Sequence, residues 1–453
     1  MWQRKVKSSL LAGFIVLLLT GYGYAEELSG EVRWSGQVAL QESVVVSRGA
    51  TLTIVAGTQI TAANPQVKIS VQGLLQVQGN ASAPVIFSGP NGWAGVEFME
   101  APAGSFFHWA QFRSAQAAIS SFATDFTVEN CTFAENEFGV RLLRESSPVI
   151  LNSTFENNQV GVANEMKSGP EIRGNRFLNQ TRSAILASHN SKGLIVENSF
   201  VKNKQGITLL QPYPDRISNN TFTENEVAIY CNQTKSSPLI EANLFERNSY
   251  GVMNFSFSYP TLRHNRFLTN MTAIHNDQYG SPAVENNLFR SNETALYNYR
   301  KSNPTVRLNS FEQNALALYC DFSAYPEVKE NNFLGNLIGV KLGIYQSADW
   351  EKRSGSKKIM KREATSRKSQ NPLIERAPET FNDFVDVSGN WWGDDTVQLV
   401  ETGADGNSGL FYDRHDKPQV TYEDYGPGVY KLDWVQFYPW LDGPVSSTGP
   451  LDQ

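Results

Sequence analysis

The sequence is poor in the side chains that build soft-metal centres. Its 453 residues include three cysteines, five histidines and six methionines. Soft metal sites need clusters of these ligands, whereas here they are scattered along the chain. The composition therefore predicts no metal site and no cofactor.

Excess positive charge is also lacking. The formal net charge of −6 argues against nucleic acid as a partner, because nucleic-acid-binding proteins usually present a basic surface. Beyond the first 25 residues, no apolar run is long enough to cross a bilayer. We therefore expect no transmembrane segment in the mature protein.

The first residues have the pattern of an export signal. Arg4, Lys5 and Lys7 precede an apolar run at 10–20, and small residues lead up to Ala25. A positive start, a short apolar segment and small residues at the cleavage site are typical of a signal peptide. We expect cleavage after Ala25 and an exported protein, periplasmic or extracellular. An uncleaved anchor is the alternative, although the run is short for a membrane span.

A phenylalanine returns every 22 or 23 residues through the middle of the chain. A fixed period of this length is typical of a solenoid, in which each repeat stacks on its neighbours. The apolar segments between these residues are too short for helices and alternate as strands do. The phenylalanines are Phe133, Phe155, Phe177, Phe200, Phe222, Phe245, Phe267, Phe289, Phe311 and Phe333.

Two columns of asparagine accompany the phenylalanines, two residues before and three residues after them. Because Asn tolerates a left-handed backbone, we expect the sharp bends of each coil at these residues. Stacked Asn side chains can also hydrogen-bond from coil to coil. The first column contains Asn175, Asn198, Asn220, Asn243, Asn265, Asn287, Asn309 and Asn331, and the second Asn136, Asn158, Asn203, Asn225, Asn248, Asn270, Asn292, Asn314 and Asn336.

These columns predict an all-β fold, a parallel β-helix solenoid with three short strands in each coil. Successive coils rise by ~4.8 Å, the spacing of neighbouring strands. We expect roughly fifteen coils on this repeat, with caps at both ends that protect the exposed strand edges.

The repeat resembles the right-handed parallel β-helix superfamily of pectate lyases and polygalacturonases, and more closely the bacterial NosD-like β-helix-repeat proteins. The resemblance covers roughly 28–345 and 381–441, and it includes the opening segment 49–58 and the closing segments 390–393 and 438–441. It implies a right-handed β-helix. Because the repeat is scaffold, it implies little about activity. A copper-site maturation role, suggested by the NosD-like resemblance, is a remote alternative because the soft ligands are scattered.

The chain divides around the repeat. We assign residues 1–25 to the signal peptide, 26–104 to the N-terminal cap and first coils, 105–346 to the regular coils, and 381–453 to the last coil and C-terminal cap. The aromatic stack is expected to begin at Phe112, 21 residues before the first Phe of the regular series.

Residues 347–380 interrupt the repeat as a basic, flexible insertion. The part at 351–376 has nine Lys or Arg and three Glu, a composition typical of an exposed loop. Such a loop can contact an acidic polysaccharide, a phospholipid surface or the acidic body of the protein, although a solvated loop is the simpler interpretation. The repeat resumes at Asn390, and Trp392 takes the position of the phenylalanine.

The repeat also places the cysteines. Cys231 and Cys320 share a column but lie four coils apart, so roughly 19 Å separates them, beyond the reach of a disulfide. Cys131 falls in the first asparagine column. We expect all three to be lone, packed thiols, with a metal site as the weaker alternative.

One face of the solenoid is unusually aromatic. Strand alternation directs two neighbouring columns outward, and rings there can stack on sugars while Asp, Asn and Arg bond hydroxyl groups. The alternative is cross-strand stacking that only covers the sheet. The first column is Tyr230, Met253, His275, Tyr297 and Tyr319, and the second is Asn232, Phe255, Asp277, Tyr299 and Asp321, with Arg300 in the next turn.

The predicted ligand-binding residues are Tyr230, Phe255, Tyr297, Tyr299, Arg300 and Tyr319. We expect a non-catalytic binding or scaffold module of the cell envelope, with a polysaccharide or another envelope component as partner. The alternative is a polysaccharide lyase, hydrolase or epimerase. Its candidate catalytic residues are His275, Asp277 and Asp321, because the two Asp backbones, roughly 10 Å apart, approach the spacing of an inverting carboxylate pair.

Overall fold

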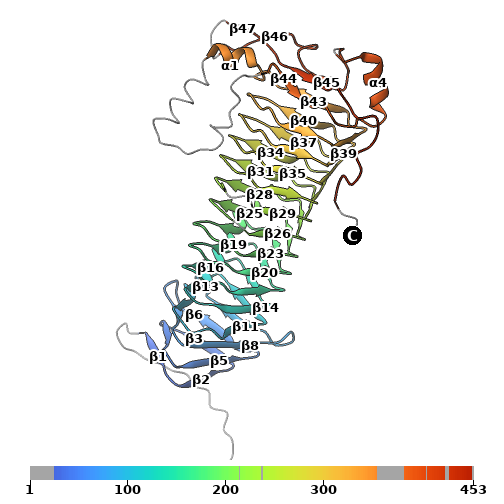
Figure 1. The fold of residues 1–453 in the computed structure, drawn as a ribbon. Helices are drawn as coiled ribbons and strands as arrows, with labels where there is room; N and C mark the ends of the chain where they lie inside the picture. The colour runs from blue at the N-terminus through green and yellow to red at the C-terminus, as the bar shows by residue number, and fades with distance from the viewer. Residues whose placement is uncertain are drawn as a thin grey trace, which may run out of the picture.

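The computed structural model describes residues 25–213, 215–235, 238–354, 382–404, 406–423 and 428–450. They form one long parallel β-helix with short helices and strands at its C-terminal end (Figure 1). Each coil gives one strand to each of three sheets, here called A, B and C, with 16, 14 and 14 strands. The predicted all-β solenoid is confirmed, with about fourteen coils rather than fifteen.

Sheet A carries the outward aromatic columns. Its strands, in spatial order, are β1 (Glu26–Leu28), β4 (Val44–Val46), β7 (Lys68–Val71), β10 (Gly95–Met99), β13 (Ala117–Phe122), β16 (Phe138–Leu143), β19 (Val160–Asn164), β22 (Ser183–Ala187), β25 (Gln205–Leu210), β28 (Val227–Asn232), β31 (Tyr250–Phe255), β34 (Thr272–Asp277), β37 (Thr294–Asn298), β40 (Leu316–Cys320), β43 (Ile338–Leu342) and β45 (Phe411–Tyr412).

Sheet B follows sheet A in each coil and includes the strands after the proline-bearing turns. Its strands are β2 (Glu31–Trp34), β5 (Thr51–Val55), β8 (Leu74–Gln78), β11 (Ser105–His108), β14 (Phe126–Glu129), β17 (Val149–Leu151), β20 (Glu171–Arg173), β23 (Leu194–Val196), β26 (Arg216–Ser218), β29 (Leu239–Glu241), β32 (Thr261–Arg263), β35 (Ala283–Glu285), β38 (Thr305–Arg307) and β41 (Glu327–Lys329).

Sheet C carries the repeated phenylalanines. Its strands are β3 (Gln37–Leu40), β6 (Gln59–Ala62), β9 (Val85–Ser88), β12 (Ala110–Arg113), β15 (Thr132–Ala134), β18 (Thr154–Glu156), β21 (Arg176–Leu178), β24 (Ser199–Val201), β27 (Thr221–Thr223), β30 (Leu244–Glu246), β33 (Arg266–Leu268), β36 (Leu288–Arg290), β39 (Ser310–Glu312) and β42 (Asn332–Leu334).

The phenylalanines form one continuous inward stack. Phe222 is fully buried, with ring centroids 4.7 Å from Phe200 and 4.9 Å from Phe245. The stack ends on Trp392, 4.3 Å from Phe333, as the sequence predicts. Its start differs from the expectation, because Phe87 already stacks on Phe112 at 4.6 Å. Longer turns in that coil put these two residues 25 positions apart, which hides Phe87 from a search for the 22-residue period.

The asparagine columns form buried hydrogen-bonded ladders, as predicted. The side-chain nitrogen of Asn198 donates to Oδ1 of Asn220 (3.0 Å) and to the carbonyl of Ile172 (2.9 Å), and its backbone N–H donates to the same Oδ1 (2.9 Å). These bonds replace the strand ladder where the backbone turns. Each ladder ties consecutive coils together at a bend.

The prediction that these asparagines are left-handed is wrong. The left-handed residue is the one directly before each ladder position, for example Glu197 (φ 59°) and Lys202 (φ 55°). The physical reason is that the ladder requires the amide to point inward, so the residue on the outside of the bend takes the left-handed conformation. It does so even where it is neither Gly nor Asn, at a conformational cost of about 1–2 kcal/mol each.

The inward column of sheet A holds two of the three predicted lone thiols and an amide ladder. Cys231 and Cys320 are buried and free, as is Cys131. Asn254 donates to Asn276 (2.9 Å) and Asn276 donates to Asn298 (2.8 Å). The column is therefore structural.

The C-terminal cap consists of α1 (Ala348–Ser354), β44 (Phe384–Asp386), α4 (Asp395–Thr402), β46 (Gln419–Thr421), β47 (Val429–Lys431) and β48 (Trp434–Gln436). Strand β44 pairs in parallel with β48, and β46 pairs antiparallel with β47. In Figure 1 this cap lies at the end opposite β1.

Helix α1 differs from the expectation for the insertion at 347–380. Its Trp350 packs against Phe322 and Tyr422, with centroids 5.8 and 6.1 Å away, and Glu351 is almost fully buried. A count of charges misses these contacts, so the expected flexible segment cannot begin at 347. Residues 355–381, like the predicted signal peptide up to residue 24, lie outside the described residues. Among the residues that the structure describes, no helix has the length and apolar character needed to cross a membrane.

A buried carboxylate joins the cap to the coils. Asp433 is fully buried and accepts hydrogen bonds from the Tyr325 hydroxyl (2.8 Å) and from the backbone N–H of Ala348 (2.8 Å). Burial raises the pKa of Asp433 to about 7. The contact links the turn after β40, the start of α1 and the segment before β48.

Candidate functional site

The outward side chains of β28, β31, β34, β37 and β40, with the residues that directly follow β37 and β40, form what we call the aromatic face. Strand pairing aligns its first column, in the order Tyr230, Met253, His275, Tyr297 and Tyr319. The second column is Asn232, Phe255, Asp277, Tyr299 and Asp321, the last two fixed by backbone bonds to β34 and β37. The repeat spacing thus brings together the residues that it predicts.

Three rings of the first column are stacked on one another. The centroids of His275 and Tyr297 lie 4.7 Å apart with planes 9° apart, and those of Tyr297 and Tyr319 lie 4.5 Å apart at 17°. Both faces of the Tyr297 ring are therefore covered. The Tyr297 ring is left with its edge and hydroxyl group for a ligand, so its contribution is hydrogen bonding rather than stacking.

Tyr230 and Phe255 are better placed for stacking. Both are partly exposed, and within the described part of the chain neither stacks on another ring. The neighbours of Tyr230 in its column are Thr208 and Met253. Aromatic ring faces are apolar and electron-rich, and these two lie at the end of the aromatic face farther from the cap.

Asp277 and Arg300 form a closed ion pair on this face. The guanidinium donates from Nε to Oδ1 (2.6 Å) and from Nη2 to Oδ2, and the N–H of Gln278 adds a third bond to Oδ1 (2.7 Å). Asp277 is 6% exposed, and the guanidinium of Arg300 lies 5.2 Å from the centre of the Tyr299 ring. The hydrogen bond from Arg300 to the carboxylate raises the pKa of Arg300. Bidentate pairs of this kind are geometrically specific.

Asp321 is shielded from solvent by neighbouring residues. It is 4% exposed and accepts bonds from the N–H groups of Phe322 (2.9 Å) and Tyr345 (2.8 Å) and from the Tyr319 hydroxyl (3.1 Å). Gly343 closes the site, since a Cβ there would overlap the carboxylate and the phenol oxygen. Burial raises the pKa of Asp321 above its usual value.

The candidate catalytic residues lie close together, but both carboxylates already have hydrogen-bond partners. Asp277 is bound by Arg300 and Asp321 is covered, with Tyr299 between them in the column. Burial lowers the pKa of His275, which favours a neutral imidazole at neutral pH. Acid–base chemistry here would require Asp277 to be released from its partner, and the catalytic role stays a prediction.

The cap limits the aromatic face at one end. Phe322 contacts Tyr299 (5.6 Å between centroids) and Tyr345 (4.9 Å), and it packs against the buried cap residues Trp350 and Tyr422. Rings continue from sheet A into the cap without a break. The part that remains open to a ligand is therefore the stretch over β28 to β40.

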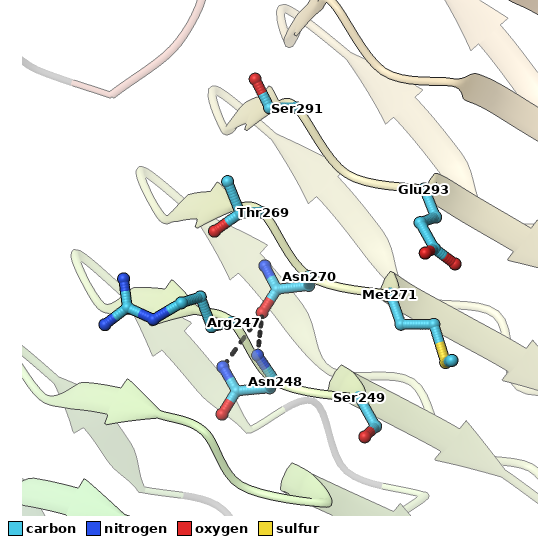
Figure 2. Close-up of a pocket in the computed structure, with 8 residues that line it drawn as sticks. All are labelled: Arg247, Asn248, Ser249, Thr269, Asn270, Met271, Ser291 and Glu293. Atoms are coloured by element: carbon cyan, nitrogen blue, oxygen red, sulfur yellow. Dashed lines mark hydrogen bonds between the residues drawn. The ribbon is translucent and has the colours of Figure 1, made fainter.

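A shallow polar hollow of about 420 Å³ lies at the bend between sheets C and A (Figure 2). Its floor includes the ladder pair Asn248 and Asn270, and Met271 on its rim is 53% exposed. The sequence-based search did not mark this place, since its outer residues vary from coil to coil. The residues that line it are Arg247, Asn248, Ser249, Thr269, Asn270, Met271, Ser291 and Glu293.

The donor set does not fit copper. In the described ranges no three His, Cys, Asp or Glu side chains lie close enough together to hold a metal ion. Burial raises the pKa of Cys131 and of Cys231 to about 12, which disfavours the thiolate that binds metals.

Comparison with known proteins gives two family matches. The model described as periplasmic copper-binding protein (NosD) matches residues 104–254, and the model described as right handed beta helix region matches residues 215–349. No curated protein matches the chain.

Two similar solved structures are mutants of the tailspike protein of E. coli bacteriophage HK620. The first, in complex with a pentasaccharide, is 10% identical, with 69% of each chain covered and a TM-score of 0.42. The second is 9% identical, with 69% of each chain covered and a TM-score of 0.33. From its coil pattern, its three parallel sheets and its family matches, this chain is a right-handed β-helix repeat protein.

Proposed function

We propose that this protein is an exported, non-catalytic module of the cell envelope that binds a polysaccharide on the aromatic face. The observation that carries the proposal is the continuous band of partly exposed rings over five adjacent strands. Export is supported by the signal pattern at residues 1–25 and by the match to a periplasmic family.

The chemistry of the face suits sugars. Tyr230 and Phe255 offer apolar surface, and the stacked ring of Tyr297 offers a hydroxyl group. Burial raises the pKa of Tyr297 to about 12, so its phenol remains a protonated donor at neutral pH. The strand ladder and the Asp277–Arg300 pair hold these groups in place, which lowers the entropy cost of binding.

A glycan array with the wild-type protein and the double variant Tyr230→Ala/Phe255→Ala tests the proposal. We expect binding without turnover, and a loss of tenfold or more in the double variant, equal to about 1.4 kcal/mol or more. The matched control is Phe106→Ala, which removes a partly exposed ring from the outside of sheet B and should leave binding unchanged. Equal binding by all three proteins would place the ligand elsewhere.

A polysaccharide-active enzyme is the second candidate. The observation that favours it is the raised pKa of Asp321 in contact with the Tyr319 hydroxyl, because perturbed acids gather at catalytic sites. It predicts release of reducing or unsaturated ends, lost in Asp277→Asn and in Asp321→Asn. Binding with no product after long incubation would remove this candidate.

A further inference from the structure

We propose that the aromatic face selects uncharged polysaccharides and rejects polyanionic ones such as uronate polymers. This inference rests on the proposed function and adds the class of ligand. It follows from an account of the charges, donors and acceptors that lie on the face.

The half of the aromatic face farther from the cap, together with the neighbouring strand β25, is uncharged. Strands β25, β28 and β31 carry only neutral side chains on their outward side, and most of them are partly exposed. The outward residues are Gln205, Thr208, Leu210, Val227, Tyr230, Asn232, Tyr250, Met253 and Phe255. A carboxylate lying here would be desolvated without a cation to compensate it, which is costly.

The cations nearer the cap already contact carboxylates or an aromatic ring. Arg300 is bound in two places by Asp277, and the ammonium of Lys301 lies 3.4 Å from the buried carboxylate of Glu351. The next cation in the first column, Lys341, lies beyond the Tyr319 rung with its ammonium 5.5 Å from the centre of the Tyr412 ring. Recognition of a carboxylate usually uses a free guanidinium or ammonium. The two cations beside the aromatic face, Arg300 and Lys301, are paired with carboxylates, and Lys341 lies outside the face on β43.

The groups left to bind a ligand match hydroxyls. Asn232, between Tyr230 and Phe255, is partly exposed, and its Nδ2 donates to the Tyr230 hydroxyl (3.3 Å). This amide and phenol are neutral hydrogen-bonding groups of the kind that pair with sugar hydroxyls. Asp321 accepts from two N–H groups and a phenol, so when ionised it would repel an anionic polymer.

Binding to matched polymers tests the inference. Soluble β-glucan and glucomannan, whose C6 hydroxyls are free, serve as neutral probes, and polygalacturonate and alginate as acidic ones, each at low and high salt. The tightest neutral binder is then oxidised at C6 to its uronate form. We expect binding to a neutral polymer, insensitive to salt, and a loss of tenfold or more on oxidation.

A charge-release variant sharpens the test. Asp277→Asn removes the carboxylate that occupies Arg300, so the variant should gain salt-sensitive affinity for polygalacturonate. The control is Glu312→Gln on sheet C, which removes the carboxylate that accepts a hydrogen bond from Nε of Arg290 (2.8 Å). This variant should gain no affinity for polygalacturonate. Thermal unfolding of each variant confirms that it is folded.

The outcomes separate the two levels of the proposal. Acidic polymers that bind the wild type and are lost in Tyr230→Ala/Phe255→Ala would overturn the selectivity and leave the polysaccharide site standing. A wild type that binds none of the polymers, or binds them equally well in that double variant, would overturn the site itself. A neutral preference that disappears in the double variant supports both.

Discussion

Two stacks of aromatic rings run along this solenoid, one inside sheet C and one outside sheet A. Their geometry is almost the same, with centroids 4.7 Å apart for Phe200 and Phe222 and 4.5 Å apart for Tyr297 and Tyr319. The inner rings are fully buried, whereas the outer ones are partly exposed and lie beside carboxylates and a guanidinium. Ring stacking is therefore a property of the coil spacing, and the inner stack stabilises the fold while the outer one shapes a surface.

The largest difference between the stacks should appear in stability. Phe222→Ala leaves a cavity between two rings and should lower the free energy of unfolding by about 3–5 kcal/mol. Tyr297→Ala removes a ring that still contacts solvent and should cost less than half as much. Denaturant unfolding of both variants measures the difference, and equal losses would mean that the outer stack is also core.

The ladders offer the second comparison, between an inward and an outward asparagine. Asn265→Ala removes the acceptor of the Asn243 backbone N–H (3.0 Å) and side chain (3.1 Å), leaving buried groups unsatisfied at a cost of about 1–3 kcal/mol. Asn232→Ala, on the aromatic face, should change stability little. Unfolding midpoints that rank the two variants in the opposite order would contradict the ladder account.

The junction between the cap and the coils should make stability depend on pH. Because the pKa of Asp433 is raised from 3.8 to about 7 in the folded protein, the native state holds a proton that the unfolded chain releases. Its contribution to stability is complete below the unfolded pKa and is lost as pH rises towards 7, with a slope of at most about 1.4 kcal/mol per pH unit. Asp433→Asn should flatten this part of the profile. Unfolding free energies that change with pH in parallel for the wild type and Asp433→Asn would contradict this role of Asp433.

The smallest effect concerns the hydroxyl group of Tyr297. Tyr297→Phe keeps the stacked ring and removes one donor, so stability should hold while glycan affinity falls by about 0.5–1.5 kcal/mol. Titration calorimetry with the bound glycan measures the change. An unchanged affinity would restrict the site to Tyr230 and Phe255.

Periodicity made most of the scaffold predictable. The 22-residue spacing identifies the inner stack, the ladders, the lone cysteines and the return of the repeat at Trp392, since each depends on a residue meeting its copy one coil away. The search for this spacing missed Phe87 because its coil has longer turns. The left-handed conformation was wrongly assigned to the asparagines, because their backbone tolerance was considered without the hydrogen bonds that hold their side chains inward.

The site was predictable only as a set of columns. Alternation places Tyr230, His275 and Tyr297 in one outward column, but it cannot show that Tyr297 is covered on both faces. Asp277 is held in an ion pair by Arg300, which lies in a turn outside the repeat. The cover over Asp321 comes from Gly343 and Tyr345, beyond the last regular strand. Contacts made by irregular segments leave no periodic signal.

The most direct test of the central claim is the affinity of Tyr230→Ala/Phe255→Ala for a neutral polysaccharide that the wild type binds, measured beside Phe106→Ala and with unfolding monitored for all three. The account predicts that the double variant stays folded and loses tenfold or more of its affinity, while Phe106→Ala binds as the wild type does. A folded double variant with undiminished affinity would contradict the claim that the aromatic face is the binding site.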